Sequence, residues 1–153
     1  KSIGSCGIPV VGHIGLTPQS IHQLGGFRVQ GKTPEAAKRL FKVAQALEEA
    51  GAFAIVLETI PAPLASLISQ RTSIPTIGIG AGADCDGQVL VINDMLGLFT
   101  EFVPKHTKQY AQLANIMSNA ITSYYNEVKT GSFPTEEHSF SMDESILVEL
   151  RNQ

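Results

Sequence analysis

Two ionisable residues, His13 and Glu58, each stand at the end of a short apolar run of the kind that forms buried strands. The runs are Ile8–Val11 and Phe53–Leu57. A carboxylate at such a position is partly desolvated, which disfavours its charged form and suits a group that takes a proton from carbon near neutral pH. An imidazole in a glycine-rich setting can hydrogen-bond a ligand oxygen. These residues are therefore a candidate general base and a candidate binding residue.

Each of the two residues also has a purely structural explanation. A glutamate at a strand end can turn into solvent or pair with a neighbouring lysine, and a histidine at a strand end can hydrogen-bond the backbone. Ionisable side chains at the carboxyl ends of parallel strands are often catalytic in barrel enzymes. The residue types alone leave both explanations open for His13 and for Glu58.

Other residues that could carry chemistry are weaker candidates. The segment 78–83 superficially fits the dinucleotide-binding pattern G-x-G-x-x-G/A, but the polar link after it is not the start of a helix. Its glycines are better explained by tight turning. Asp84 and Asp86 could be imagined as magnesium ligands, although beside Gly87 they are more typical of a turn.

The cysteines and the remaining histidines show no ligand-like spacing. Cys6 and Cys85 fit neither C-x-x-C nor a zinc pattern, and they are predicted to be reduced, buried residues without chemistry. His22, His106 and His138 are expected at the surface.

The elements that must position these residues alternate along the chain. Strands are predicted over 8–11, 53–57, 74–79 and 88–92, and helices over 33–51, 64–70, 105–129 and 143–150. The link between the last two strands is too short for a crossover helix, so either that helix is reduced to a turn or one strand prediction is wrong. This alternation indicates an α/β fold with a parallel sheet, and it fits a Rossmann-like sheet and part of a barrel equally well.

Composition excludes several classes of partner. A net charge of −3 gives no reason to expect a nucleic-acid or anionic-membrane surface. No apolar run approaches the roughly 20 residues that a membrane-spanning helix needs. The first residues lack the organisation of a signal peptide. We therefore expect a cytoplasmic protein that binds neither nucleic acid nor membrane.

Several long motifs resemble those of the ketopantoate hydroxymethyltransferase family: GHIGLTPQS, LGGFRVQGK, VLETIP, IPTIGIGAGADCDGQVLV and EEHSF. The resemblance implies an α/β fold of the (β/α)8 TIM-barrel type. The chain would cover roughly the C-terminal half of the barrel plus C-terminal helices, with 1–153 a single partial barrel domain and 132–153 a polar C-terminal tail. A complete barrel typically has about 250 residues, so we expect the chain to be part of a longer polypeptide.

The same resemblance implies an activity. A hydroxymethyl group would pass from 5,10-methylenetetrahydrofolate to 3-methyl-2-oxobutanoate, giving ketopantoate through an enolate that Mg²⁺ stabilises. Glu58 matches the general base of the family and His13 its substrate-binding histidine, whereas the metal ligands are expected upstream, with none in this chain. The resemblance also implies a homo-oligomer, usually a decamer. Two alternatives stay open: another enolate-forming enzyme of the phosphoenolpyruvate/pyruvate barrel superfamily, or a non-catalytic half-barrel.

Overall fold

A computed structural model describes residues 1–151 of the chain. The residues group into two compact units, Lys1–Tyr110 and Ala111–Gln153, each of which is described by itself. Among the described residues, no helix has both the length and the apolar character needed to cross a membrane.

The first unit is built on a parallel sheet of four strands. The strands are β1 (Val11–Gly15), β2 (Ala54–Glu58), β3 (Thr76–Ile79) and β4 (Gly87–Gln88), and they lie side by side in the order β1-β2-β3-β4. Strands that follow one another in chain order without reversal are typical of a (β/α)8 barrel, whereas a Rossmann sheet reverses its order at a switch point. The strand order thus favours part of a barrel over a Rossmann-like sheet, two folds that fit the sequence pattern equally well.

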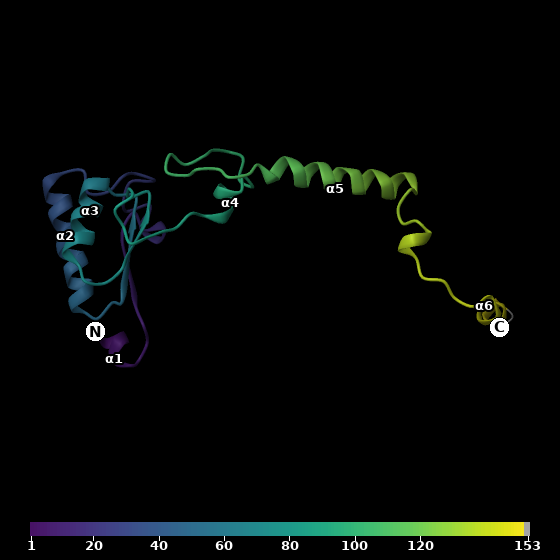
Figure 1. Ribbon diagram of the computed structural model, residues 1–153, viewed down its shortest axis with the longest axis horizontal. Helices are drawn as coiled ribbons and strands as arrows, with labels where there is room; N and C mark the ends of the chain where they lie inside the picture. Colours follow the sequence, from purple (N-terminus) through teal and green to yellow (C-terminus); the bar gives the residue numbers. More distant parts are fainter. Residues whose placement is uncertain (152–153) are drawn as a thin grey trace. The chain divides into compact units, whose positions relative to one another are not determined.

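Two helices, α2 (Pro34–Glu49) and α3 (Ala62–Arg71), cover one side of this sheet and contact each other (Figure 1). The core lies between the helices and the strands. It consists of buried side chains from both layers: Ile14, Ala44, Ile55, Leu57, Ile60, Ala65, Ile68 and Ala81. Burying these apolar side chains is the main force that holds the helices against the sheet.

Local sequence signals account for the bounds of α2. The side chain of Thr33 accepts a hydrogen bond from the backbone N–H of Ala36 at 3.3 Å, and Pro34 occupies the first helical position. Beyond the helix, Gly51 has a φ of 90°, a conformation that glycine adopts at no steric cost. The predicted cap and terminator are both confirmed.

The first strand lies further along the chain than predicted. Ile8 is 55% exposed, and pairing with β2 begins at Val11 and continues to Gly15. Pro9 has no N–H to give to a ladder, which explains why the segment 8–10 does not start the strand. His13 is therefore inside β1 rather than just beyond a strand.

The connection from β3 to β4 contains no helix, so the predicted crossover is reduced to a loop of residues 80–86. The predicted strand 88–92 shrinks to Gly87–Gln88, and its last residue begins the short helix α4 (Ile92–Met95). The glycines behave as expected of tight turns: Gly82 has a φ of 89°, and a Cβ there would clash with Ala62 at the start of α3.

The second unit contains α5 (Leu113–Thr130), η2 (Glu136–His138) and α6 (Glu144–Arg151). The helix predicted over 105–129 begins eight residues late, because the N–H of Tyr110 donates to the carbonyl of Met95 instead of joining a helix. Gly131 ends α5 with a φ of 74°. The remaining short elements of the chain are α1 (Ser2–Ser5) and η1 (Pro18–Ser20).

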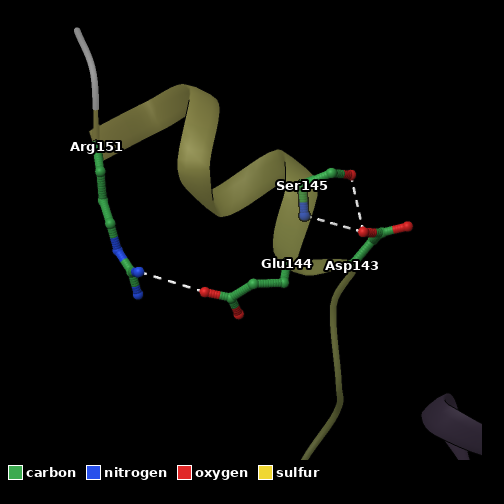
Figure 2. Close-up of polar contacts among 4 residues, drawn as sticks. All are labelled: Asp143, Glu144, Ser145 and Arg151. Atoms are coloured by element: carbon green, nitrogen blue, oxygen red, sulfur yellow. Dashed lines mark hydrogen bonds and ion pairs between the residues drawn. The ribbon is translucent and has the colours of Figure 1, made fainter.

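The last helix confirms the prediction for 143–150 to within one residue. Asp143 caps it by accepting hydrogen bonds from the N–H and hydroxyl of Ser145 at 2.9 and 2.8 Å, while Glu144 pairs with Arg151 at 3.3 Å (Figure 2). The N–H of Ser145 lowers the pKa of Asp143, since it stabilises the carboxylate. Residues 152–153 of the predicted polar tail lie outside the described residues.

Asp86 joins the start of β3 to the loop before β4. Its Oδ2 accepts hydrogen bonds from the N–H and the hydroxyl of Thr76, both at 2.8 Å, and Thr76 is fully buried. The Thr76 hydroxyl also lies 2.7 Å from that of Ser69 in α3. Asp86 is thus a structural residue, as the turn interpretation required.

These hydrogen bonds predict a pH-dependent stability. The N–H of Thr76, and then its hydroxyl, hold the pKa of Asp86 below its ordinary value of 3.8. A lowered folded-state pKa stabilises the fold above about pH 4, and this contribution is lost as the pH falls through that pKa. The melting temperature of Asp86→Asn should therefore lie below that of wild type at pH 6, and the difference should narrow as the pH is lowered below about 4. Asp84→Asn, at an exposed neighbour, is the matched control; a gap independent of pH would contradict the assignment.

Candidate functional site

The side chains of His13 and Glu58 meet at the carboxyl end of the sheet. Gly15 pairs with Glu58 across the β1–β2 ladder, and His13 is two residues before Gly15. Because alternate residues of a strand point to the same side, His13 and Glu58 are diagonal neighbours on one face. Nε2 of His13 lies 2.8 Å from Oε2 of Glu58. The structure therefore brings the two candidate residues into direct contact.

This pair lies on the face of the sheet opposite α2 and α3. On the helix-covered face Ile14, Ile55 and Leu57 are at most 5% exposed, whereas the side chains of His13 and Glu58 are 33% and 18% exposed. A pair that is partly desolvated yet still accessible can receive a small ligand. The two apolar runs thus form the strands that position the pair. The alternation of side chains along each strand places both on the face of the sheet opposite the helices.

The hydrogen bond between the two side chains has one possible direction when the carboxylate is ionised. An ionised carboxylate can only accept hydrogen bonds, so Nε2 of His13 is the donor when Glu58 is charged. This contact uses one carboxylate oxygen, and Oε1 of Glu58 makes no further hydrogen bond to the described residues. Chemically, the pair can take a proton at Oε1 while the imidazole holds the carboxylate in place.

The backbone beside Glu58 also contacts β1 and the residue after it. The carbonyl of Glu58 accepts a hydrogen bond from the N–H of Leu16 at 2.8 Å. Gly15 approaches the same carbonyl so closely, with a φ of 96°, that a Cβ would overlap its oxygen. Glycine is thus required at this position, and the close approach fixes the spacing of β1 and β2 at the site.

The other candidates take no part in this pair. His22, His106 and His138 are exposed, as predicted. Cys85 is partly buried against the core, but Cys6 is exposed, so its predicted burial is wrong; the short helix α1 that precedes it buries no residue. Among residues 1–151, no three His, Cys, Asp or Glu side chains gather in a way that could hold a metal ion.

Sequence reasoning missed the contact between His13 and Glu58 and the unusual backbone of Thr59, which has a φ of 51°. The contact could have been inferred from a parallel pairing of the two runs in the correct register. The conformation of Thr59 has no signal in the residue type, since a β-branched residue ordinarily avoids positive φ.

Comparison with known proteins finds similar sequences along nearly the whole chain. The family model described as ketopantoate hydroxymethyltransferase matches residues 1–136. Three similar curated proteins are named 3-methyl-2-oxobutanoate hydroxymethyltransferase. The one from Dehalococcoides mccartyi (strain 195) is 63% identical over 99% of this chain and 54% of its own length. Those from Acetivibrio thermocellus and Clostridioides difficile are 56% and 55% identical over 98% of this chain and 53% and 54% of their own.

The chain thus spans about half the length of the curated relatives it matches. Four parallel strands in sequential order, with helices on one side, are what a part of a (β/α)8 barrel contains, and the predicted α/β, TIM-barrel fold class is confirmed. The match extends over most of the chain and includes the strands that carry His13 and Glu58. The chain belongs to the ketopantoate hydroxymethyltransferase family.

Proposed function

We propose that the protein containing this chain transfers a hydroxymethyl group from 5,10-methylenetetrahydrofolate to 3-methyl-2-oxobutanoate, giving ketopantoate. The observation that carries the proposal is the hydrogen-bonded pair of His13 and Glu58 at the carboxyl ends of adjacent parallel strands. Membership of the family and the printed names of the relatives support the same reaction.

In this proposal Glu58 is the general base. Its free oxygen accepts the proton from C3 of the keto acid, and the electron pair of the broken C–H bond moves into an enolate whose charge rests on the keto oxygen. Water replaces both C–N bonds of the folate methylene group, which leaves tetrahydrofolate and a one-carbon unit at the oxidation level of formaldehyde. C3 of the enolate bonds to that carbon, and the electron pair of its C=O bond moves to the oxygen, which takes a proton and becomes the new hydroxyl. His13 has two tasks: it holds Glu58 through Nε2, and it helps to orient the keto acid.

The resemblance implies that the ligands of the proposed Mg²⁺ lie upstream of this chain, and we propose the same here. Mg²⁺ is often held by only one or two carboxylates with water and substrate oxygens, so this part of the proposal rests on the resemblance. The resemblance also supports a cytoplasmic homo-oligomer, a decamer, for the whole protein. The single partial barrel domain over 1–153 stays a prediction.

The reaction is tested by separating its two halves. The natural gene product that carries this sequence is incubated in D2O with 3-methyl-2-oxobutanoate, and the C3 proton is followed by NMR. We expect exchange without folate and ketopantoate once 5,10-methylenetetrahydrofolate is added. Exchange without folate-dependent product would favour another enolate-forming enzyme. A folded protein with neither activity would favour the non-catalytic half-barrel.

A further inference from the structure

Thr59, the residue directly after Glu58, has a backbone that its side chain disfavours. Its φ is 51°, and it is the one non-glycine residue with positive φ among residues 1–151. A β-branched side chain at positive φ is a genuine outlier, and such strain persists only where surrounding contacts impose it. Outliers of this kind gather at functional sites.

Backbone hydrogen bonds from both neighbouring segments impose this conformation. The N–H of Thr59 donates to the carbonyl of Ile79 in β3 at 2.8 Å, and its carbonyl accepts from the N–H of Gln30 at 2.9 Å. The carbonyl of Glu58 accepts from Leu16. Leu16 and Gln30 both belong to the connection 16–33 between β1 and α2, Leu16 at its start and Gln30 near its end. The backbone of Glu58 and Thr59 is therefore hydrogen-bonded to β3 and to two points of the connection 16–33.

The conformation determines where the sheet face ends. We call the face of the sheet opposite α2 and α3 the open face. If β2 continued in an extended form past Glu58, the alternation of side chains would place Ile60 on this open face together with Glu58. Ile60 is instead 2% exposed and belongs to the core that contains Leu57. The chain turns back toward the helices at Thr59, which leaves Glu58 as the last β2 side chain on the open face.

We propose that Thr59 and Gln30 are positioning residues: the N–H of Gln30 holds Thr59 at positive φ, and this sets the direction of the Glu58 carboxylate toward His13. The inference rests on the proposed function for its effect on rate, but not for its effect on structure. Without the bond from Gln30, Thr59 relaxes toward negative φ and Glu58 turns away from His13.

The first test compares Gln30→Pro with Gln30→Ala in the natural gene product. Both substitutions remove the side-chain hydrogen bond from Gln30 to the carbonyl of Arg28, but only proline removes the backbone N–H. We expect Gln30→Pro to lower kcat for C3 exchange about tenfold or more with KM nearly unchanged, since a small misplacement of a catalytic group has a large effect on rate. Gln30→Ala should stay within about twofold. Equal effects of the two variants would overturn the proposal.

The second test combines these variants with Thr59→Gly. Glycine adopts positive φ without strain, so Thr59→Gly alone should keep kcat within about twofold and should not lower Tm. In the Gln30→Pro background it should restore most of the lost kcat, because nothing then drives residue 59 away from positive φ. If Gln30→Pro lowered kcat equally with threonine and with glycine at position 59, Gln30 would not act through Thr59.

A measurement independent of activity covers the case in which Gln30→Pro does not fold. Hydrogen exchange of the Gln30 amide reports how often its bond to Thr59 opens. Thr59→Gly should slow this exchange severalfold, because the closed state is no longer strained, whereas Thr59→Val, which stays β-branched, should leave it unchanged. Unchanged exchange in Thr59→Gly would overturn the inference, and absence of C3 exchange in wild type would instead count against the proposed function.

Discussion

Glu58→Gln is expected to abolish most of the C3 proton exchange, lowering its rate by about 10²–10⁴-fold, the range typical of removing a general base. The amide has nearly the shape of the carboxylate. In the unsubstituted protein Nε2 of His13 lies 2.8 Å from Oε2 of Glu58, and the amide oxygen of glutamine can accept the same hydrogen bond. It cannot accept a proton from carbon. Keto-acid binding, measured as Kd by titration calorimetry, should therefore change little while exchange measured by NMR falls.

The control for this variant is Glu48→Gln. The carboxylate of Glu48 accepts a hydrogen bond from the N–H of Ser73 at 2.6 Å, on the helix-covered side of the sheet and away from the pair. Its replacement should leave the exchange rate within about twofold of wild type, because it changes no contact of Glu58. Exchange in Glu58→Gln at the wild-type rate would remove Glu58 from the role of base.

Much of the fold follows from local signals in the sequence. The continuous apolar run 53–57 predicts β2 to within a residue. An inner strand of a parallel sheet typically appears in the sequence as such a run, without alternating polar residues. The residues Thr33 and Gly51 delimit α2. The threonine side chain accepts a hydrogen bond from a free N–H of the first turn, and glycine adopts the positive φ that ends the helix without steric cost. Such features need no knowledge of distant residues, which is why the sequence is sufficient for them.

Features that depend on distant partners are beyond sequence reasoning. The start of α5 is one example. The N–H of Tyr110 donates to the carbonyl of Met95, and the amphipathic pattern therefore overestimates the length of the helix at its start. The start of β1 is another, because pairing with β2, and not the apolar run, decides which residues form the ladder. The pattern predicts the type of these elements and misplaces their bounds.

The candidate site shows the same division. His13 and Glu58 are recognisable one by one as ionisable residues beside apolar runs, but their contact depends on a register between segments 45 residues apart. The strained Thr59 depends on hydrogen bonds from Ile79 and Gln30, which belong to two other segments. Residue types therefore suggest what the site can do, and only the tertiary structure shows which groups act together.

His13→Leu is expected to lower kcat for C3 exchange by about 10–100-fold and to raise KM for the keto acid. Leucine removes the N–H that holds the Glu58 carboxylate, and a hydrogen bond to a charged group contributes about 1.5–3 kcal/mol, which corresponds to that range of rates. The carboxylate is only 18% exposed, so water replaces the lost donor incompletely. Exchange kinetics followed by NMR over a range of keto-acid concentrations give kcat and KM separately.

His13→Gln separates the two tasks of this histidine. The amide N–H of glutamine can reach the position of Nε2, so it keeps a donor for Glu58 but has no imidazole for the substrate. If His13 acts on both, His13→Gln should regain most of kcat while KM stays raised. His22→Leu, at an exposed histidine of the loop after β1, should change neither value. A loss of kcat in His13→Gln as large as in His13→Leu would mean that the imidazole ring, and not its hydrogen bond to Glu58, is what the reaction requires.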